Sequence, residues 1–137
     1  ELVAEQSYEG EGWGLCFDGE ALWMTDGSST LFRRDPDTFE VLSTVTVRLD
    51  QNPVPYLNEL ECVGGKVYAN VWLTDFIVRI DPATGAIEAL INAANLRTLA
   101  GITDSGAVLN GIAYDATRDI FLVTGKLWPV IFEVRFE

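Results

Sequence analysis

The sequence predicts an all-β protein built from a repeated unit of about 45 residues. Two pairs of landmarks support this interpretation. Cys16 and Cys62 lie 46 positions apart, and the same interval separates Asp35 from Asp81, each of which is followed by proline. A third, looser copy begins near Ile112 and carries two extra residues. A fixed period of this length indicates a repeat architecture.

The first two copies contain short runs of β-branched and aromatic residues, separated by Asp, Gly, Ser and Pro, which favour turns. In the first copy the runs that predict strands are Gly14–Phe17, Ala21–Met24, Thr30–Arg34 and Glu40–Val47. Four strands in roughly 45 residues is the spacing of a β-propeller blade. We therefore predict an all-β fold of the β-propeller type. The alternative, a β-sandwich made by tandem duplication, rarely keeps an ungapped repeat with this turn order.

We predict a single partial β-propeller domain over residues 1–137, with about three four-stranded blades. Its parts are a strand of a preceding blade at 1–8, a blade at 12–48, a second blade at 58–91 and an incomplete blade at 109–137. A short helix over Ala93–Thr98 is expected to connect two blades. Because closed propellers use about 4–8 blades, we expect a second chain or self-association to complete the ring.

The composition excludes several classes of function. The 137 residues include 21 acidic and 9 basic side chains, giving a net charge of −12, and the basic residues form no cluster. Such a chain does not suit the phosphate backbone of nucleic acids or an anionic membrane surface, and no apolar run is long enough to span a bilayer. The chain has no histidine, which excludes Ser-His-Asp and Cys-His catalysis and imidazole zinc ligands.

Several residues are assigned to structure. Cys16 and Cys62 occupy the same place in successive repeats and are interpreted as small buried apolar residues, because free cysteine is among the most buried residue types. Two cysteines do not fix the redox compartment. Trp23, Trp128 and the Asp-Pro pairs are assigned to packing and turns, since proline presets the backbone angle of a turn.

Six motifs follow one another in order, and together they resemble those of the plant and bacterial type of glutaminyl-peptide cyclotransferase, also called glutamine cyclotransferase. The resemblance covers the chain from about Tyr8 onward and corresponds to roughly the carboxy-terminal half of a family member. The motifs are Glu9–Leu15, Thr25–Gly27, Leu57–Glu61, Ala69–Asp75, Val108–Ala113 and Thr124–Pro129.

The resemblance implies a fold, an activity and a location. The family is a five-bladed β-propeller that converts the amino-terminal glutamine of peptides into pyroglutamate with release of ammonia, an acyltransferase reaction. It implies no metal and no other cofactor, and it suggests a secreted or periplasmic location. The expected partners are peptides with an amino-terminal glutamine.

The family's site residues match this sequence at Trp13, Asn58, Trp72 and Lys126. We expect Lys126 and Asn58 to be catalytic, as a donor near the reacting carbonyl and as a group orienting the substrate. Trp13 and Trp72 are expected to wall the substrate pocket. In the repeat, Trp13 and Asn110 fall at one equivalent position where an innermost strand begins, and Asn58 falls at the matching place, so Asn110 is added as substrate-binding.

The resemblance places the family's catalytic glutamate in its amino-terminal blades, which the matched carboxy-terminal half does not include. We therefore expect activity only when the other half of the propeller is present. Glu59 and Glu61 lie beside the matched residue Asn58, and alternation places them on one face of a strand; neither is assumed to replace the missing acid.

Two other functions are kept open. The absent carboxylate favours a propeller that serves only as an interaction or scaffold module. A metal-assisted, lactonase-like propeller would instead use Asn58, Glu59 and Asn110 as oxygen ligands, which suit hard cations. The motifs around these residues do not resemble that second family as a whole.

Overall fold

The computed structural model describes residues 1–136, which form an all-β chain of antiparallel sheets with one short helix. The first sheet contains β1 (Gly14–Phe17), β2 (Leu22–Thr25), β3 (Thr30–Arg34) and β4 (Val41–Thr46). The second sheet contains β7 (Leu57–Val63), β8 (Lys66–Val71), β9 (Phe76–Ile80) and β10 (Ile87–Asn92). The third sheet contains β11 (Leu109–Asp115), β12 (Ile120–Gly125) and β13 (Phe132–Val134).

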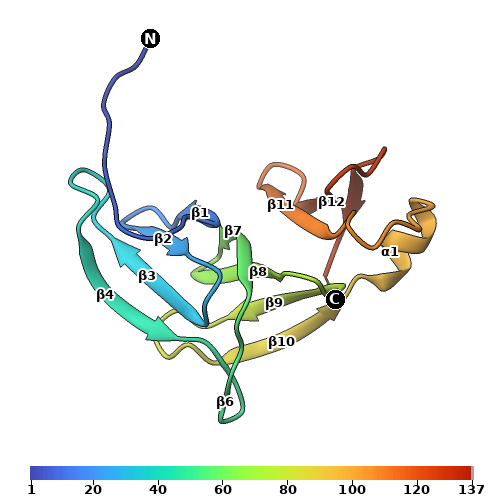
Figure 1. The fold of residues 1–137 in the computed structure, drawn as a ribbon, viewed down its shortest axis with the longest axis horizontal. Helices are drawn as coiled ribbons and strands as arrows, with labels where there is room; N and C mark the ends of the chain where they lie inside the picture. Colours follow the sequence, from blue (N-terminus) through green and yellow to red (C-terminus); the bar gives the residue numbers. More distant parts are fainter. Residues whose placement is uncertain (137) are drawn as a thin grey trace.

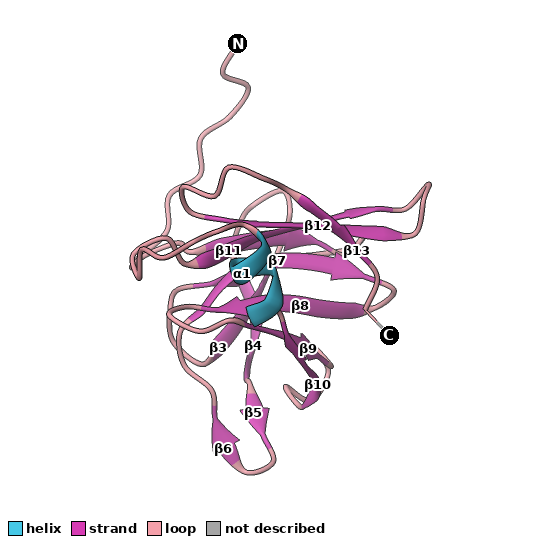
Figure 2. Cartoon of the chain, turned by 90° about the vertical axis from the view of Figure 1, so that its right-hand side faces the viewer, coloured by secondary structure: helices cyan, strands magenta, loops and turns pink. Residues whose placement is uncertain are grey.

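Two smaller elements connect the sheets. The hairpin of β5 (Arg48–Leu49) and β6 (Asn52–Pro53) follows the first sheet and was not predicted. The helix α1 (Ala94–Leu99) joins the second sheet to the third and agrees with the predicted helix to within one residue. It appears in cyan in Figure 2. No helix among residues 1–136 is both long and apolar enough to cross a membrane.

Each sheet is a simple meander, because its strands pair in the order in which they follow along the chain. The predicted strands of the first copy coincide with β1 and β3 and differ by one residue at the ends of β2 and β4. The third sheet has three strands among the described residues, as the incomplete third copy predicts; Glu137 lies outside the described range.

The amino-terminal segment departs from its prediction. Residues 1–8 form no strand, and the start of this segment extends away from the sheets (Figure 1), whereas Gln6 and Tyr8 contact the turn between β3 and β4. A strand acquires its hydrogen bonds from a neighbour, and this segment pairs with none of the described strands. The predicted strand of a preceding sheet is therefore not formed here.

The three sheets lie side by side around their first strands (Figure 1). The strand β7 contacts both β1 and β11, while β4 and β10 lie at the periphery. The beginnings of the innermost strands therefore come together from segments far apart in the sequence.

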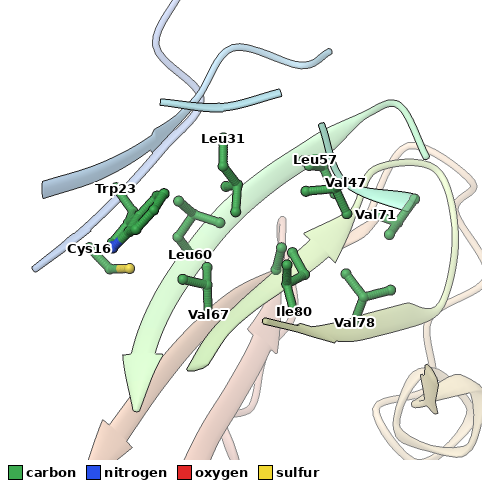
Figure 3. Close-up of a cluster of buried hydrophobic side chains, with 11 residues drawn as sticks. Cys16, Trp23, Leu31, Val47, Leu57, Leu60, Val67, Val71, Val78 and Ile80 are labelled. Carbon is green, nitrogen blue, oxygen red and sulfur yellow. The ribbon is translucent and has the colours of Figure 1, made fainter. Parts of the chain in front are cut away.

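A buried cluster fills the space between the first and second sheets (Figure 3). Leu31 of the first sheet and Leu57 and Ile80 of the second are fully buried. One face of each sheet carries these apolar side chains, and their removal from water stabilises the contact by about 25 cal/mol per Å². The other members of the cluster are Cys16, Trp23, Val47, Leu60, Val67, Ala69, Val71 and Val78.

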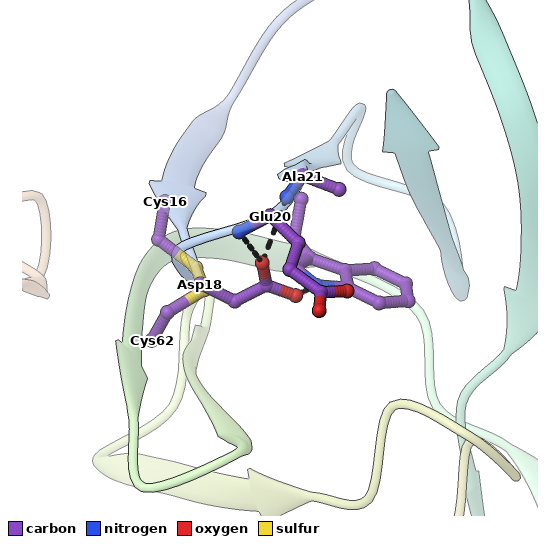
Figure 4. The surroundings of a disulfide bond; sticks show 6 residues. Cys16, Asp18, Glu20, Ala21 and Cys62 are labelled. Carbon is purple, nitrogen blue, oxygen red and sulfur yellow. Dashed lines mark hydrogen bonds between the residues drawn. A yellow bond between two sulfur atoms is a disulfide. The ribbon is translucent and has the colours of Figure 1, made fainter. Parts of the chain in front are cut away.

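The cysteines are joined, so their interpretation as two separate apolar residues was wrong. Cys16 of β1 and Cys62 of β7 form a disulfide, with their Cα atoms 5.5 Å apart (Figure 4). The cause is the repeat itself, since equivalent positions on the innermost strands of adjacent sheets face each other. This bond links the first sheet covalently to the second.

Candidate active site

All five residues predicted for the site line one pocket of about 310 Å³. Trp13 comes from the residue preceding β1, Asn58 from β7 and Asn110 from β11. Trp72 and Lys126 follow the ends of β8 and β12. The pocket is therefore built jointly by the three sheets, at the point where their innermost strands begin. Gly12 completes its lining.

The two tryptophans form a wall of the pocket. The rings of Trp13 and Trp72 meet edge to face, with centroids 5.5 Å apart and planes at 83°, an arrangement that aromatic pairs favour. Trp13 donates a hydrogen bond from its indole Nε1 to Glu11 Oε2 at 2.7 Å. The sequence reasoning missed Tyr56, whose ring packs against Trp72 at 6.0 Å and whose backbone carbonyl accepts the Trp72 N–H at 2.9 Å.

Each site asparagine lies in an irregularity of its strand. The pairing of β7 with β8 shifts register between Leu57 and Leu60, and the pairing of β11 with β12 shifts between Leu109 and Ile112. In both cases the inner strand has one extra residue, and the shift falls at the asparagine. Bulges of this kind redirect side chains and occur next to active sites. The regular alternation assumed from the sequence did not anticipate them.

Trp72 and Lys126 occupy the same position in two successive turns. Each directly follows the last residue of a second strand, and each precedes a leucine with a positive φ, 63° at Leu73 and 58° at Leu127. The first sheet has Gly27, with φ 85°, at the equivalent point. A non-glycine residue in this conformation costs roughly 1–2 kcal/mol, and such positions cluster at functional sites.

One acceptor in the pocket region has no partner. Asn110 Oδ1 is buried and accepts no hydrogen bond from any of the described residues. A buried polar atom without a partner costs about 1–3 kcal/mol. Because this oxygen is shielded from solvent, a bound molecule could reach it only if the Asn110 side chain turned toward the pocket that it lines.

Glu59 lies outside this pocket. It lines a neighbouring apolar hollow formed with Tyr8, Met24 and Phe39, and Trp13 borders both spaces. Burial raises the pKa of Glu59 above its usual range, and the nearby charge of Glu61 raises it further. The pKa of Glu61 is also raised by burial, against the opposing effect of hydrogen bonds from backbone N–H groups.

The metal-assisted alternative requires Asn58, Glu59 and Asn110 to bind one metal ion through their side-chain oxygens. Asn58 and Asn110 line the same pocket, but Glu59 lines the neighbouring hollow. Within residues 1–136, no group of three or more His, Cys, Asp or Glu side chains is arranged to hold a metal ion.

Comparison with known proteins agrees with the resemblance seen in the motifs. The family model described as glutamine cyclotransferase matches residues 1–136. The glutaminyl-peptide cyclotransferase of Arabidopsis thaliana is 44% identical over 131 residues, which cover 93% of this chain and 40% of that protein. The crystal structure of Myxococcus xanthus glutaminyl cyclase has a TM-score of 0.90 and 45% identity, covering 95% of this chain and 57% of that chain.

This chain thus spans less than two thirds of the length of either relative. The match to the family model nevertheless extends over all of the described residues. The two levels of identity and the close structural agreement point to the same group of proteins. The chain belongs to the glutamine cyclotransferase family.

Proposed function

We propose that this chain forms the carboxy-terminal part of a glutaminyl-peptide cyclotransferase, which converts an amino-terminal glutamine into pyroglutamate and releases ammonia. One observation carries the proposal: the pocket gathers Trp13, Asn58, Trp72, Asn110 and Lys126 from segments that are distant in the sequence. A module used only as a scaffold has no need of this combination. The family membership of the chain supports the same reaction.

The reaction defines what the complete site must do. The nitrogen of the α-amine attacks the carbonyl carbon of the side-chain amide, so a C–N bond forms and a ring closes. The original C–N bond of the amide then breaks, and the departing nitrogen takes a proton to leave as ammonia. The neutral α-amine loses one proton as the ring forms and the departing nitrogen gains one, so a single positioned carboxylate acting as base and then as acid balances the transfer. Fixed donors stabilise the oxyanion that develops on the carbonyl oxygen.

The residues of the pocket have distinct roles in this proposal. Lys126 supplies the positive charge and the N–H donors that favour the developing oxyanion. Asn58 orients the carboxamide by hydrogen bonding, and Asn110, which lines the pocket and whose Oδ1 has no partner, turns to receive an N–H of the substrate. Trp13 and Trp72 enclose the apolar part of the glutamine side chain and limit the access of water.

The remaining carboxylate comes from outside this chain. In the family the catalytic glutamate lies in an amino-terminal segment, and this chain covers 57% of the bacterial structure. We propose that the first, second and third sheets are consecutive blades of one β-propeller, over residues 12–48, 58–91 and 109–137. The polypeptide that completes the propeller, as a second chain or as a longer form of this one, would supply the glutamate.

A chimaeric enzyme tests the proposal. This chain would replace the matching segment of the Myxococcus xanthus glutaminyl cyclase, and ammonia release would be measured with a peptide that begins with glutamine. We expect activity with this peptide and none after its amino terminus is acetylated. Lys126→Met should lower kcat by about 100-fold, as loss of one oxyanion donor does. The matched control is Lys66→Met, because Lys66 lies in β8 and pairs with Glu88 at 2.7 Å, outside the pocket.

Three outcomes would contradict the proposal or a part of it. A chimaera that folds and releases no ammonia would favour the interaction module. Equal activity of the Lys126→Met and Lys66→Met variants would remove Lys126 from the site. Loss of activity on treatment with a chelator would instead favour the metal-assisted alternative.

A further inference from the structure

Two fully buried polar side chains connect neighbouring sheets directly behind the pocket. Thr25, the last residue of β2, and Asn70, near the end of β8, both have a relative exposure of 0%. Burying a polar group is unfavourable unless it forms hydrogen bonds. Each side chain forms one hydrogen bond with the backbone of an innermost strand in the next sheet, 33 and 41 residues further along the chain. The Asn70 Nδ2 group has no partner among the described residues.

Thr25 reaches the irregularity that contains Asn58. Its Oγ1 hydroxyl donates to the Asn58 carbonyl oxygen at 2.8 Å, and its own carbonyl accepts the Trp13 N–H at 3.0 Å. One residue therefore fixes the backbone of two residues that line the pocket. The backbone of Gly14 also lies close to the Asn58 carbonyl oxygen, because a Cβ atom at Gly14 would overlap that oxygen.

Asn70 makes the corresponding contact one sheet further on. Its Oδ1 accepts the N–H of Gly111 at 3.0 Å, at the irregularity that contains Asn110. Gly111 has φ 151°, a conformation that favours glycine. The hydrogen bond therefore holds a segment of unusual conformation immediately beside the buried Asn110 Oδ1.

We propose that Thr25 and Asn70 are positioning residues of the pocket. Each belongs to one sheet and forms a hydrogen bond with the bulge of the next sheet. That bulge carries Asn58 in the first case and Asn110 in the second. Neither residue is among those that line the pocket, so both act through the backbone of Asn58 and Asn110. The kinetic consequences of this inference rest on the proposed function. The positions of Asn58 and Asn110 can be tested without measuring activity.

The hydrogen bonds of Thr25 and Asn70 keep the pocket residues of neighbouring sheets in a fixed position relative to one another. The backbone at a bulge lacks some of the regular hydrogen bonds between strands, so its side chains are fixed less firmly than those of a regular strand. A displacement of about 1 Å in a catalytic group lowers rates by up to about 100-fold. A bond from a fully buried side chain restores the missing constraint and is protected from competition by water.

The test uses variants that remove one hydrogen bond and keep the shape. Thr25→Val removes the hydroxyl, Thr25→Ser retains it, and Asn70→Leu removes the acceptor. In residues 1–137 alone, NMR should show the side-chain amide resonances of Asn58 shifted or broadened in Thr25→Val and restored in Thr25→Ser. Asn70→Leu should disturb the amide of Asn110 and spare that of Asn58.

The kinetic readout is taken in the active chimaera. Because Asn58 is assigned to catalysis and Asn110 to binding, Thr25→Val should lower kcat by roughly 10- to 100-fold. Asn70→Leu should mainly raise KM for the glutamine peptide, by about tenfold, the factor that corresponds to 1.4 kcal/mol. Thr25→Ser should restore kcat.

A control separates positioning from general destabilisation. Ile80→Val changes a fully buried residue of the same core cluster as Leu57 and should lower the melting temperature without changing the amide resonances, kcat or KM. If Thr25→Val and Asn70→Leu also change only the melting temperature, the proposal is wrong. If the parent chimaera is inactive, the proposed function fails, and the NMR comparison alone decides the positioning role.

Discussion

The first and second sheets are held together by a disulfide and an apolar cluster of mostly branched side chains, whereas the apolar cluster at the third sheet combines aliphatic side chains with several aromatic rings. At the first boundary the Cys16–Cys62 disulfide lies beside Trp23 and a group of branched side chains. At the second boundary Phe121 contacts Tyr68, Tyr114 and Phe136, with ring centroids 4.8, 5.0 and 4.4 Å apart. The two boundaries form between equivalent strands of the same repeat.

The difference shows that the repeat fixes which strands meet but leaves open how the contact is stabilised. At both boundaries, a buried polar side chain of one sheet bonds to the innermost strand of the next, through Thr25 in the first case and Asn70 in the second. The chemistry of the surrounding core is different. The buried polar side chain that bonds to the next innermost strand is therefore common to both boundaries, and it lies next to the pocket.

The largest expected effect comes from removing the covalent bond at the first boundary. Replacing both cysteines with alanine should lower the free energy of unfolding by about 4 kcal/mol, because the disulfide closes a long loop in the unfolded chain. Urea denaturation measures the change. A reductant should destabilise the parent chain and leave the Cys16→Ala/Cys62→Ala variant unaffected; equal stability of parent and variant would show that the apolar cluster alone suffices.

A smaller effect is expected at the second boundary. Phe121→Leu keeps an apolar side chain of similar volume but removes the ring that contacts three other aromatic rings, and we expect a loss of roughly 1 to 2 kcal/mol. The matched control is Phe76→Leu, because Phe76 is exposed on β9 and should change stability by less than about 0.5 kcal/mol. Equal losses in the two variants would contradict a special role for the aromatic cluster.

The smallest effect concerns a carboxylate beside the disulfide (Figure 4). Burial raises the pKa of Asp18, but hydrogen bonds from the Ala21 N–H, the Trp23 indole and the Glu20 N–H outweigh it and hold the pKa below its ordinary value of 3.8. Asp18→Ala should lower the free energy of unfolding at neutral pH by about 1 kcal/mol through loss of these bonds.

The pH dependence of this effect follows from the sign of the shift. A carboxyl group with a lowered pKa in the folded state stabilises the fold above its ordinary pKa, and this contribution is lost as the pH falls through the folded-state pKa. Thermal melts of the parent and of Asp18→Ala should therefore differ at pH 7 and converge toward pH 2. A difference that stayed constant over this range would show that the ionised carboxylate is not responsible.

Most of the fold was predictable because its information is local. Alternating apolar residues, turn residues at fixed offsets and the period of the repeat identify the strands, and the strands of the first copy were predicted almost to the residue. The same repeat, together with the family motifs, selected the five residues that line the pocket. Residues 1–8 and the β5–β6 hairpin were exceptions, since the pairing of a strand depends on a neighbour rather than on its own sequence alone.

The sequence by itself indicated the 46-residue spacing, the strands, the family and the five candidate residues that line the pocket. Only the tertiary structure decided the pairing of Cys16 with Cys62, the bulges at Asn58 and Asn110, and the bonds from Thr25 and Asn70 that hold them. The physical reason is the distance along the sequence between the interacting residues. A strand is specified by residues that are neighbours in the chain, whereas these contacts arise when the innermost strands of separate sheets pack together.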